Sequence, residues 1–515
     1  MSAVSAASSP RELVARARGY QGLVTRSAVL VGLLTVLAAV IRLVGLAHQS
    51  YWYDEADTVS ILHTSAGGLL ARVPTWETTP PLYFMLAWLW AHLLGDGEAG
   101  LRSLSALAGI LTVPIGFAAG ARLVSRRVGL ITAGLIACNP LLVWYSQEAR
   151  SYSLLVLLSS AALLAFVHLR VRPTPRWTVI WAVTASLALA THYYAALTIV
   201  PQAIYLLARY RHTRRVRIAV GGLTVWGLLF LVLAMRQLQN LGLSNWINRV
   251  VLVHRLEDLP KAFAIGPNAP AAGWLMLGCW ILVGTSGWLT LKRANREERA
   301  AALFVGRLAL VGFAIVFALL AVGIDQMNDR NMLALWLPVA LFIAAGFGAR
   351  RAGAIGVAGA AAVCLVGLGT VIGVEANPRS QRPDWRGVAR LVSSPTAHAV
   401  FAVNGCQRLP LALYVPGLRF ARPSGAAVRE VDVIAAAGQR SWWDVLFTGG
   451  FVVCSPQTRP PVIPKRLGMF RASAHIATLN QFSVIRFRSA VPVRVTEQTF
   501  TAAGLRGAFM LAPRS

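Results

Sequence analysis

Hydrophobic and polar positions alternate in long blocks from the N-terminal region of the chain to residue 373. A helix needs about 20 mostly apolar residues to cross the roughly 30 Å hydrocarbon core of a bilayer, and the apolar blocks approach this length. The pattern predicts an all-α polytopic membrane region of about eleven spans. The spans are expected at residues 27–46, 103–121, 128–146, 151–169, 177–191, 193–208, 217–235, 273–291, 303–323, 331–348 and 352–373.

One apolar segment, residues 81–94, is too short for a comfortable span, since its helix would be only about 21 Å long. Its Trp88 and Trp90 are typical of the membrane–water interface. We expect an interfacial helix here, inside a long first outer loop of residues 47–102. A second long outer loop, residues 236–272, contains Trp246 and is expected to hold another interfacial helix.

The pattern changes after residue 373, because no later apolar run is long enough to span a membrane. Short runs typical of β-strands alternate there with Pro, Gly and polar turns. These runs are residues 398–403, 411–415, 450–454 and 482–487. Before them, Asp384 precedes a helical pattern that it is suited to cap. The sequence thus predicts three parts: an N-terminal segment at 1–26, a transmembrane domain at 27–373 and a small α/β domain at 374–515.

Composition agrees with this division. Hydrophobic residues make up 56% of the chain and charged residues 13%, against about a quarter in soluble domains. The net charge of +29 alone would suggest a nucleic-acid partner. However, the basic residues cluster in short loops beside the spans, and only three of the 49 are lysine, a skew typical of a GC-rich genome. Nucleic acid is therefore not an expected partner.

The loops fall into two alternating sets that differ in charge. The arginine-rich set contains the N-terminal segment and the loops near residues 122–127, 170–176, 209–217, 292–299 and 350–351. The positive-inside rule places this set and the N-terminus in the cytoplasm, and the acidic loops outside. The first span lacks a convincing cleavage site and predicts a signal-anchor of a multi-pass plasma-membrane protein.

An odd number of spans puts the C-terminal α/β domain outside the cytoplasm as well. Its two cysteines, Cys406 and Cys454, would then lie in an oxidising compartment. A disulfide between them and two unpaired buried thiols are equally compatible with the sequence.

Candidate chemistry gathers at the outer ends of five spans. Asp54, Glu55 and Asp57 follow the first span directly, and carboxylates at a membrane surface are costly unless they are solvated, paired or used. Glu77 precedes the pair Pro80-Pro81, which bars a helix until residue 80 and holds Glu77 on a rigid turn.

Three further elements lie on the same face of the membrane. Residues 146–152 contain Arg150, which needs a carboxylate or phosphate partner at this depth. The other two elements are His192-Tyr193-Tyr194 and the segment from Asp325 to Arg330. Each alone is compatible with a structural anchor or a solvated loop with an aromatic belt. Their convergence favours a site for an amphiphilic anionic substrate at the outer leaflet.

The ordered set resembles the C-type glycosyltransferase superfamily, in particular protein O-mannosyltransferases and aminoarabinose transferases. The resemblance covers about residues 27–350. The matching pieces are Asp54-Glu55, Glu77 before Pro80-Pro81-Leu82-Tyr83, Arg102-Ser103, residues 146–152, His192-Tyr193-Tyr194, Arg330 and Pro338. The sequence departs from many relatives at Thr79, where they have His, and at Asn331, where an aromatic residue often follows the arginine.

The resemblance implies an inverting transferase that takes sugar, with mannose expected, from a polyprenyl-phosphate donor at the outer face. The acceptor would be an envelope glycan, a lipoglycan or a protein. Asp54 would be the general base. Glu55 and Glu77 would position the acceptor or bind a divalent cation. Donor phosphate would be bound by Arg150, Tyr152, His192, Tyr193 and Arg330.

Two alternatives remain open. The first keeps the superfamily and changes the sugar, for example to arabinofuranose. The second is a lipid or solute transporter, which would place its charges near the middle of the membrane beside broken helices. Only Arg42 and Arg307 lie inside the predicted spans, each within snorkelling distance of an end, and this disfavours transport.

Overall fold

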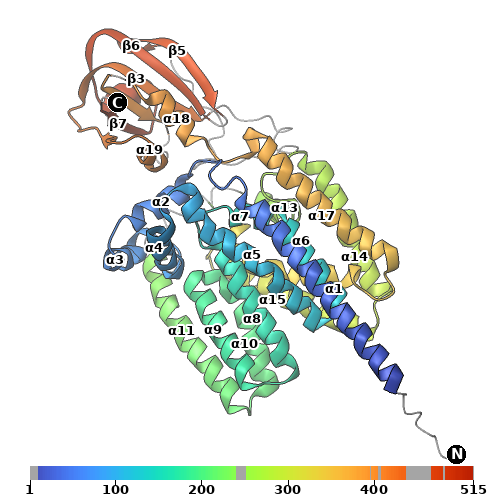
Figure 1. The fold of residues 1–515 in the computed structure, drawn as a ribbon. Helices are drawn as coiled ribbons and strands as arrows, with labels where there is room; N and C mark the ends of the chain where they lie inside the picture. The colour runs from blue at the N-terminus through green and yellow to red at the C-terminus, as the bar shows by residue number, and fades with distance from the viewer. Residues whose placement is uncertain are drawn as a thin grey trace, which may run out of the picture.

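The computed structural model describes residues 10–238, 247, 251–394, 396–403, 408–436, 466–479 and 482–513. The chain forms a bundle of helices with a smaller sheet domain at one end of it (Figure 1). The sheet domain lies at the end of the bundle where α2 begins and α17 finishes (Figure 1).

Helices occupy all the predicted spans. Among the described residues, eight helices are long and apolar enough to cross a membrane, and the bent pair α6–α7 makes a ninth. The predicted spans at 177–191 and 193–208 are the shorter helices α9 and α10, of 17 and 15 residues, so the expected eleven spans require these two to cross as well. The bounds are α1 (Pro10–Leu43), α5 (Glu98–Leu123), α6 (Arg126–Cys138), α7 (Pro140–Ser146), α8 (Tyr152–Val171), α9 (Pro175–Thr191), α10 (Ala196–Tyr210), α11 (Arg214–Leu238), α14 (Ala272–Lys292), α15 (Arg296–Ala321), α16 (Trp336–Phe347) and α17 (Gly353–Ala376), with the 3₁₀ turns η1 (Tyr193–Ala195), η3 (Arg330–Leu335) and η4 (Pro378–Ser380).

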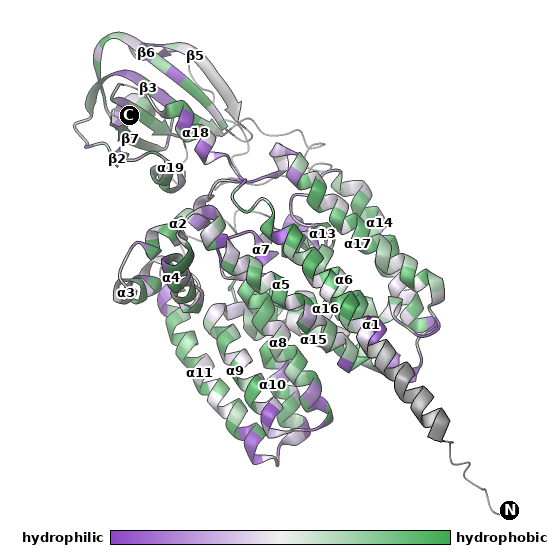
Figure 2. Ribbon diagram, viewed as in Figure 1, coloured by the Kyte–Doolittle hydropathy of each residue, from purple (hydrophilic) through white to green (hydrophobic). Residues whose placement is uncertain are grey.

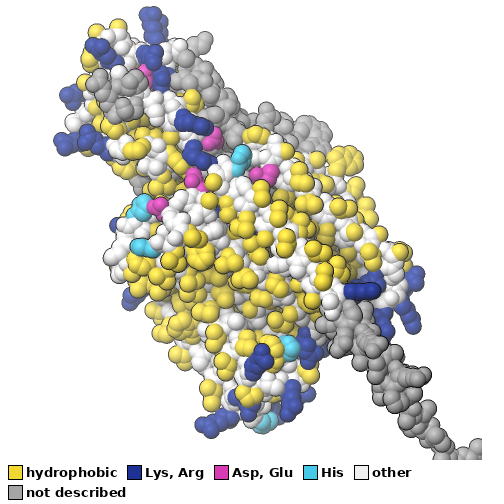
Figure 3. All heavy atoms as spheres, in the orientation of Figure 1, with side chains coloured by type: hydrophobic (Ala, Val, Ile, Leu, Met, Phe, Trp, Pro, Cys, Tyr) yellow, Lys and Arg dark blue, Asp and Glu magenta, His cyan; other side chains and the backbone are white. Residues whose placement is uncertain are grey.

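The outer surface of the bundle has the character of a lipid-facing surface. Large apolar side chains are exposed along its helices, as on α11 at Val225, Leu229 and Val232. Figure 2 shows apolar colouring over most of the bundle, and Figure 3 shows a broad belt of hydrophobic side chains with basic residues gathered at the end away from the sheet domain. Such a belt is excluded from the surface of soluble domains and is expected in a bilayer.

The span at 128–146 is broken into α6 and α7, which meet at an angle of 56°. Pro140 cannot donate a backbone hydrogen bond, so carbonyls at the end of α6 lose their helical partners. Arg42 of α1 replaces these partners: its guanidinium donates to the carbonyls of Ile136 (2.8 Å) and Ala137 (3.0 Å) and to Ser146 Oγ (3.2 Å). The expectation that Arg42 snorkels is therefore wrong, because the side chain is fully buried. Arg307 is exposed on α15.

Short helices form the end of the bundle nearest the sheet domain. They are α2 (Tyr53–Leu62), α3 (Ala66–Trp76) and α4 (Leu82–Leu94) (Figure 1). The predicted interfacial segment is α4, which buries Tyr83, Phe84 and Ala87 and exposes apolar residues such as Leu93 on its other side. In the second long loop, α13 (Leu252–Ile265) is helical, whereas Trp246 lies outside the described residues.

The C-terminal part is a mixed sheet in the order β2-β7-β1-β3-β6-β5-β4. Strands β1 and β3 are parallel and the other neighbours are antiparallel. Helix α18 (Trp385–Val392) buries Trp385 and Val388 in a core shared with Val400 and Ile434. The remaining bounds are β1 (His398–Ala402), α19 (Arg408–Tyr414), β2 (Arg419–Phe420), β3 (Ala426–Ala436), β4 (Arg466–Leu467), β5 (Phe470–Leu479), β6 (Phe482–Val495), α21 (Glu497–Ala502) and β7 (Ala508–Ala512).

The local predictions for this domain have mixed outcomes. Asp384 caps α18 as expected, because its Oδ1 accepts a hydrogen bond from the Gly387 amide (2.9 Å). The runs at 398–403 and 482–487 lie in β1 and β6. The strand predicted at 411–415 is wrong, since these residues belong to α19 and its C-terminal cap, with Leu411 packed beside α18. The run at 450–454, Cys406 and Cys454 lie outside the described residues.

Candidate active site

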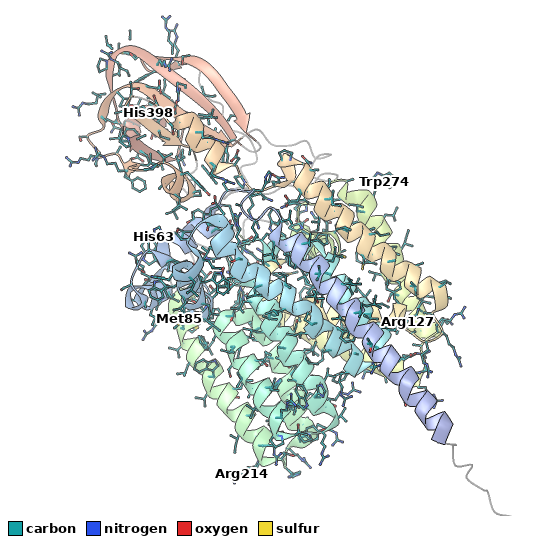
Figure 4. The ribbon with its side chains drawn as sticks, viewed as in Figure 1. His63, Met85, Arg127, Arg214, Trp274 and His398 are labelled. Atoms are coloured by element: carbon teal, nitrogen blue, oxygen red, sulfur yellow. The ribbon has the colours of Figure 1, made fainter. Side chains whose placement is uncertain are left out.

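Most of the predicted site residues lie at the end of the bundle that faces the sheet domain. They come from α2, from the turn between α7 and α8, from η1 and from the start of η3. In Figure 4, His63 marks this end, whereas Arg127 and Arg214 lie at the opposite end.

Asp54 and Arg330 form the most accessible ion pair of the site. Arg330 Nη1 lies 2.6 Å from Asp54 Oδ2, and the two side chains are 15% and 18% exposed. The Arg330 guanidinium also lies over the ring of Tyr152, 5.7 Å from its centre. The residue predicted as general base is therefore in contact with an arginine predicted to bind donor phosphate.

Glu77 and Arg150 form a second pair, which is more deeply buried. Arg150 Nη1 and Nη2 donate to the two Glu77 oxygens at 2.9 and 3.3 Å, and Nη1 also reaches Thr58 Oγ1 at 3.2 Å. The rigid turn of Pro80-Pro81 follows Glu77, which is the C-terminal cap of α3. Of the two anionic partners expected for Arg150, the structure provides a carboxylate, that of Glu77.

Asp57 belongs to the same cluster, although no role was predicted for it from the sequence. It lies one turn after Asp54 on α2, so both side chains lie on one face of that helix. Burial, followed by the negative charge of Glu77, raises the pKa of the Asp57 carboxyl to about 8. These effects favour the protonated form of Asp57, which shares a side-chain hydrogen bond with Glu77.

Glu55 lies further inside and serves as a structural anchor in this geometry. Arg102 donates to both of its oxygens, at 2.7 and 2.6 Å, and the Ala149 amide donates to Oε1 at 2.8 Å. Burial alone would raise the pKa of Glu55, but the Arg102 charge and hydrogen bonds hold that pKa below its usual value. Glu55 therefore joins α2, α5 and the turn before α8.

The aromatic candidates differ in placement. His192 is buried beside Tyr152, with 5.7 Å between ring centres. Burial, with Arg150 and Arg330 adding to it, lowers the pKa of His192 to about 3, so its ring is neutral. Tyr193 lies apart, because its hydroxyl donates to Gln237 Oε1 of α11 at 2.7 Å. The structure thus brings together Asp54, Arg330, Tyr152, His192, Arg150 and Glu77. Glu55 is buried behind them against Arg102, and Tyr193 is bound to α11 instead.

A second residue without an assigned role is Glu148, in the same turn as Arg150. It is fully buried and pairs with Arg382 of the C-terminal part, with 3.2 Å between Oε2 and Nη2. Burial raises the pKa of Glu148 to about 7, although Arg382 opposes this shift. The partner lies 234 residues away, so no local signal in the sequence could have identified the pair.

The structure gives limited support for a bound cation. Within the described ranges, three metal-ligating side chains come within 4.8 Å of one another only at His398, Glu430 and Asp432 of the sheet domain. Arg486 donates to both Asp432 oxygens at 2.8 and 2.9 Å, and Arg488 donates to Glu430 at 2.9 Å. This group is an ion-pair network whose carboxylates are already neutralised. A cation at Glu55 or Glu77 stays a prediction, and both carboxylates face arginines.

Comparison with known proteins connects this geometry to a class. Residues 78–235 match the family model described as dolichyl-phosphate-mannose-protein mannosyltransferase. The structure of ArnT from Cupriavidus metallidurans in the apo state aligns with a TM-score of 0.51 at 12% identity, over 91% of this chain and 98% of ArnT. ArnT bound to undecaprenyl phosphate aligns with a TM-score of 0.49 at 13% identity, over 88% and 97%. The apo Archaeoglobus fulgidus oligosaccharyltransferase gives a TM-score of 0.42 at 13% identity, over 84% and 64%.

No curated protein matches the chain. By its fold the chain is a polytopic helical membrane protein with a C-terminal mixed sheet. More particularly, its fold is that of ArnT, and residues 78–235 are similar to the dolichyl-phosphate-mannose-protein mannosyltransferase family. The resemblance inferred from the sequence is thereby confirmed.

Proposed function

We propose that this protein transfers a sugar, mannose, from a polyprenyl-phosphate donor to a hydroxyl group of an envelope glycan, a lipoglycan or a protein. The transfer inverts the anomeric centre and takes place at the outer face of the membrane. The description of the matching family names a dolichyl-phosphate sugar, which supports this class of donor. The ArnT fold, also solved with undecaprenyl phosphate bound, is in keeping with it.

The observation that carries the proposal is the graded exposure of four carboxylate–arginine pairs. The pairs Glu55–Arg102, Glu77–Arg150 and Glu148–Arg382 have side chains at most 8% exposed, whereas those of Asp54–Arg330 are 15% and 18% exposed. Opening a fully buried pair leaves an uncompensated charge, so an incoming phosphate exchanges most readily with Asp54 for Arg330. Donor binding would then free a carboxylate beside the reacting carbon.

The chemistry follows from this exchange. The acceptor oxygen attacks the anomeric carbon while the bond from that carbon to the phosphate oxygen breaks, and polyprenyl phosphate leaves with the bonding electrons. Asp54 takes the proton of the acceptor hydroxyl. Arg330 stabilises the negative charge that grows on the leaving phosphate, and the Tyr152 ring lies against that guanidinium.

A cavity supports a place for the prenyl tail. An apolar cavity of about 270 Å³ lies between α6, α13, α14, α15, α16 and α17, and Phe263, Trp280 and Trp336 are among its lining residues. Trp336 begins α16 directly after η3, whose first residue is Arg330. A tail bound in this cavity would therefore contact α16, which directly follows the turn that begins with Arg330, the arginine proposed to hold its phosphate.

The broken span is a feature that transporters share. Its buried charge is nevertheless satisfied within the protein, because Arg42 donates to helix carbonyls and to Ser146. The pairs of the candidate site, Asp54–Arg330, Glu55–Arg102, Glu77–Arg150 and Glu148–Arg382, lie at the end of the bundle near the sheet domain. This arrangement supports an enzyme with a site at the membrane surface.

The decisive experiment supplies purified protein with a panel of labelled polyprenyl-phosphate sugars and with the corresponding nucleotide sugars. Transfer should require the lipid-linked donors and should be highest with mannose. Preference for polyprenyl-phosphate arabinofuranose would show that the transferred sugar is arabinofuranose and not mannose, and would leave the proposed class of transferase unchanged. Robust transfer from a nucleotide sugar without a lipid carrier would remove the proposal.

The proposed orientation has its own test. A reporter fused after residue 376 should be active only outside the cytoplasm, and one fused within residues 209–217 only inside. Reversal of both results would place the site on the cytoplasmic face.

A further inference from the structure

We propose that the C-terminal domain is a positioning element of the active site. The segment that enters this domain, residues 381–386, is called here the junction segment. Together with Tyr414 of α19, it would hold the loop of residues 46–51, which leads directly to Asp54 and Glu55. The inference rests on the proposed function and assigns the C-terminal domain a role in it.

The junction segment makes hydrogen bonds along the length of this loop. Ser50 Oγ donates to the Pro383 carbonyl and accepts from the Trp385 amide, both at 2.8 Å. The Arg382 amide donates to Gln49 Oε1 at 2.9 Å. Arg386 Nη2 donates to the carbonyls of Ala47 and His48, each at 2.6 Å. Ser50 is almost fully buried, so its hydroxyl has no access to water in exchange for these bonds.

Tyr414 extends the contact to the last residue of the loop. Its hydroxyl accepts a hydrogen bond from the Tyr51 amide and donates one to Glu98 Oε1, both at 2.7 Å. Glu98 is the first residue of α5 and also lies 3.6 Å from Arg386 Nε. Tyr414 thus joins the sheet domain, the loop and α5 at one point.

The inner side of the same loop is held by a residue that also fixes the site. Arg102 donates to the carbonyls of Leu46 (2.8 Å), Gln49 (2.7 Å) and Ser50 (3.1 Å) while it binds Glu55. The loop is therefore clamped between Arg102 inside and the junction segment outside. Movement of the junction segment would be transmitted over a few residues to Asp54.

A buried ion pair joins the junction segment to the other half of the site. Arg382 donates to Glu148 Oε2 and to the Trp144 carbonyl, both at 3.2 Å, and stacks 4.0 Å from the centre of the Trp144 ring. Glu148 lies two residues before Arg150, the partner of Glu77. One segment thus contacts the loop that leads to Asp54 and the turn that carries Arg150.

Conservative substitutions test the inference. Ser50→Ala and Tyr414→Phe each remove hydrogen bonds with almost no change in volume. We expect each to lower kcat about 3- to 10-fold, the usual effect of losing such bonds, while the donor KM stays within about twofold because Arg330 and Tyr152 are unchanged. Amide hydrogen exchange in residues 46–57 should become faster in both variants.

Two matched controls make the same changes elsewhere. Ser286→Ala removes a buried bond to the Ile343 carbonyl between α14 and α16, and Tyr210→Phe removes a bond to the Arg170 carbonyl. Both should leave kcat and the exchange of residues 46–57 unchanged. Unchanged kcat in Ser50→Ala and Tyr414→Phe would overturn the inference, as would an equal loss in the controls. A wild-type protein that transfers sugar from no polyprenyl-phosphate donor would instead refute the proposed function. Amide hydrogen exchange would then be the remaining test of the inference. Exchange rates in residues 46–57 equal to those of the wild type in both Ser50→Ala and Tyr414→Phe would show that the C-terminal domain does not hold this loop.

Discussion

Replacing Asp54 with asparagine should separate catalysis from donor binding. The substitution keeps the shape of the side chain and removes both the proton acceptor and the negative charge that faces Arg330 at 2.6 Å. Loss of a general base usually lowers turnover by about two to four orders of magnitude. Asp54→Asn should therefore be folded and nearly inactive.

Donor binding should change in the opposite direction. In the wild-type protein a donor phosphate must displace Asp54 from Arg330, and a charged hydrogen-bonded pair at the accessible edge of a site is worth about 1–2 kcal/mol. Asp54→Asn removes this competition, since a neutral amide holds the guanidinium less strongly. Affinity for a polyprenyl-phosphate sugar should consequently rise roughly 5- to 30-fold.

The assay is single-turnover transfer in detergent, combined with direct measurement of donor binding and a check of folded yield. Glu77→Gln is the matched control, because it also neutralises a carboxylate that faces an arginine and should change acceptor affinity more than the rate of the bound complex. A near-normal rate in Asp54→Asn together with an inactive Glu77→Gln would move the base to Glu77. Unchanged donor affinity in Asp54→Asn would contradict the phosphate-binding role of Arg330.

Three further outcomes test other parts of the site. Arg150→Ala should weaken donor binding, as measured by titration with a labelled donor. Unchanged binding would show that Arg150 does not bind the donor phosphate and serves only as the partner of Glu77. Asp57→Asn should remove a pH dependence of stability: the pKa of Asp57 is raised from 3.8 to about 8, so its contribution to stability is present at low pH and is lost as pH rises from about 4 to 8. In thermal unfolding in detergent, the melting temperature of Asp57→Asn should therefore rise relative to that of the wild type as pH increases over this range. Parallel curves of melting temperature against pH for the two proteins would refute the assignment. Gly109→Val should lower folded yield by overpacking, because a Cβ at Gly109 would lie 2.1 Å from Ser146 Oγ and 2.9 Å from Arg42 Nε; normal yield would show that the α6–α7 bend adapts.

The sequence was sufficient for features that depend on local pattern. The apolar blocks predicted the helices of the bundle, and the acidic cap predicted the start of α18 at Asp384. The order of Asp54-Glu55, Glu77, Arg150 and His192 also identified chain stretches that meet in space, because each follows or precedes a span on the same side of the membrane.

Long-range pairing and tertiary packing were beyond this reasoning. The run at 411–415 has the composition of a strand, yet the chain is helical there because Leu411 packs beside α18. From the sequence alone, Arg42 is expected to snorkel. In the structure it is buried instead, because the bend at Pro140 leaves the carbonyls of Ile136 and Ala137 to accept its hydrogen bonds. The raised pKa of Asp57 depends first on its burial and then on Glu77 at the end of a separate helix, and no spacing in the sequence reveals either.

The balance of charges gives the proposed cycle a direction. The carboxylates of Asp54, Glu55, Glu77 and Glu148 each face an arginine, so a donor phosphate has to compete with a carboxylate for its guanidinium. Once Asp54 has taken the proton of the acceptor, it no longer competes for Arg330, and the arginine stabilises the leaving phosphate during bond cleavage. When Asp54 releases that proton, its charge returns and competes again with the product for the same guanidinium. The exchange that admits the donor would thus also promote release of polyprenyl phosphate, with one carboxylate–arginine pair serving both steps.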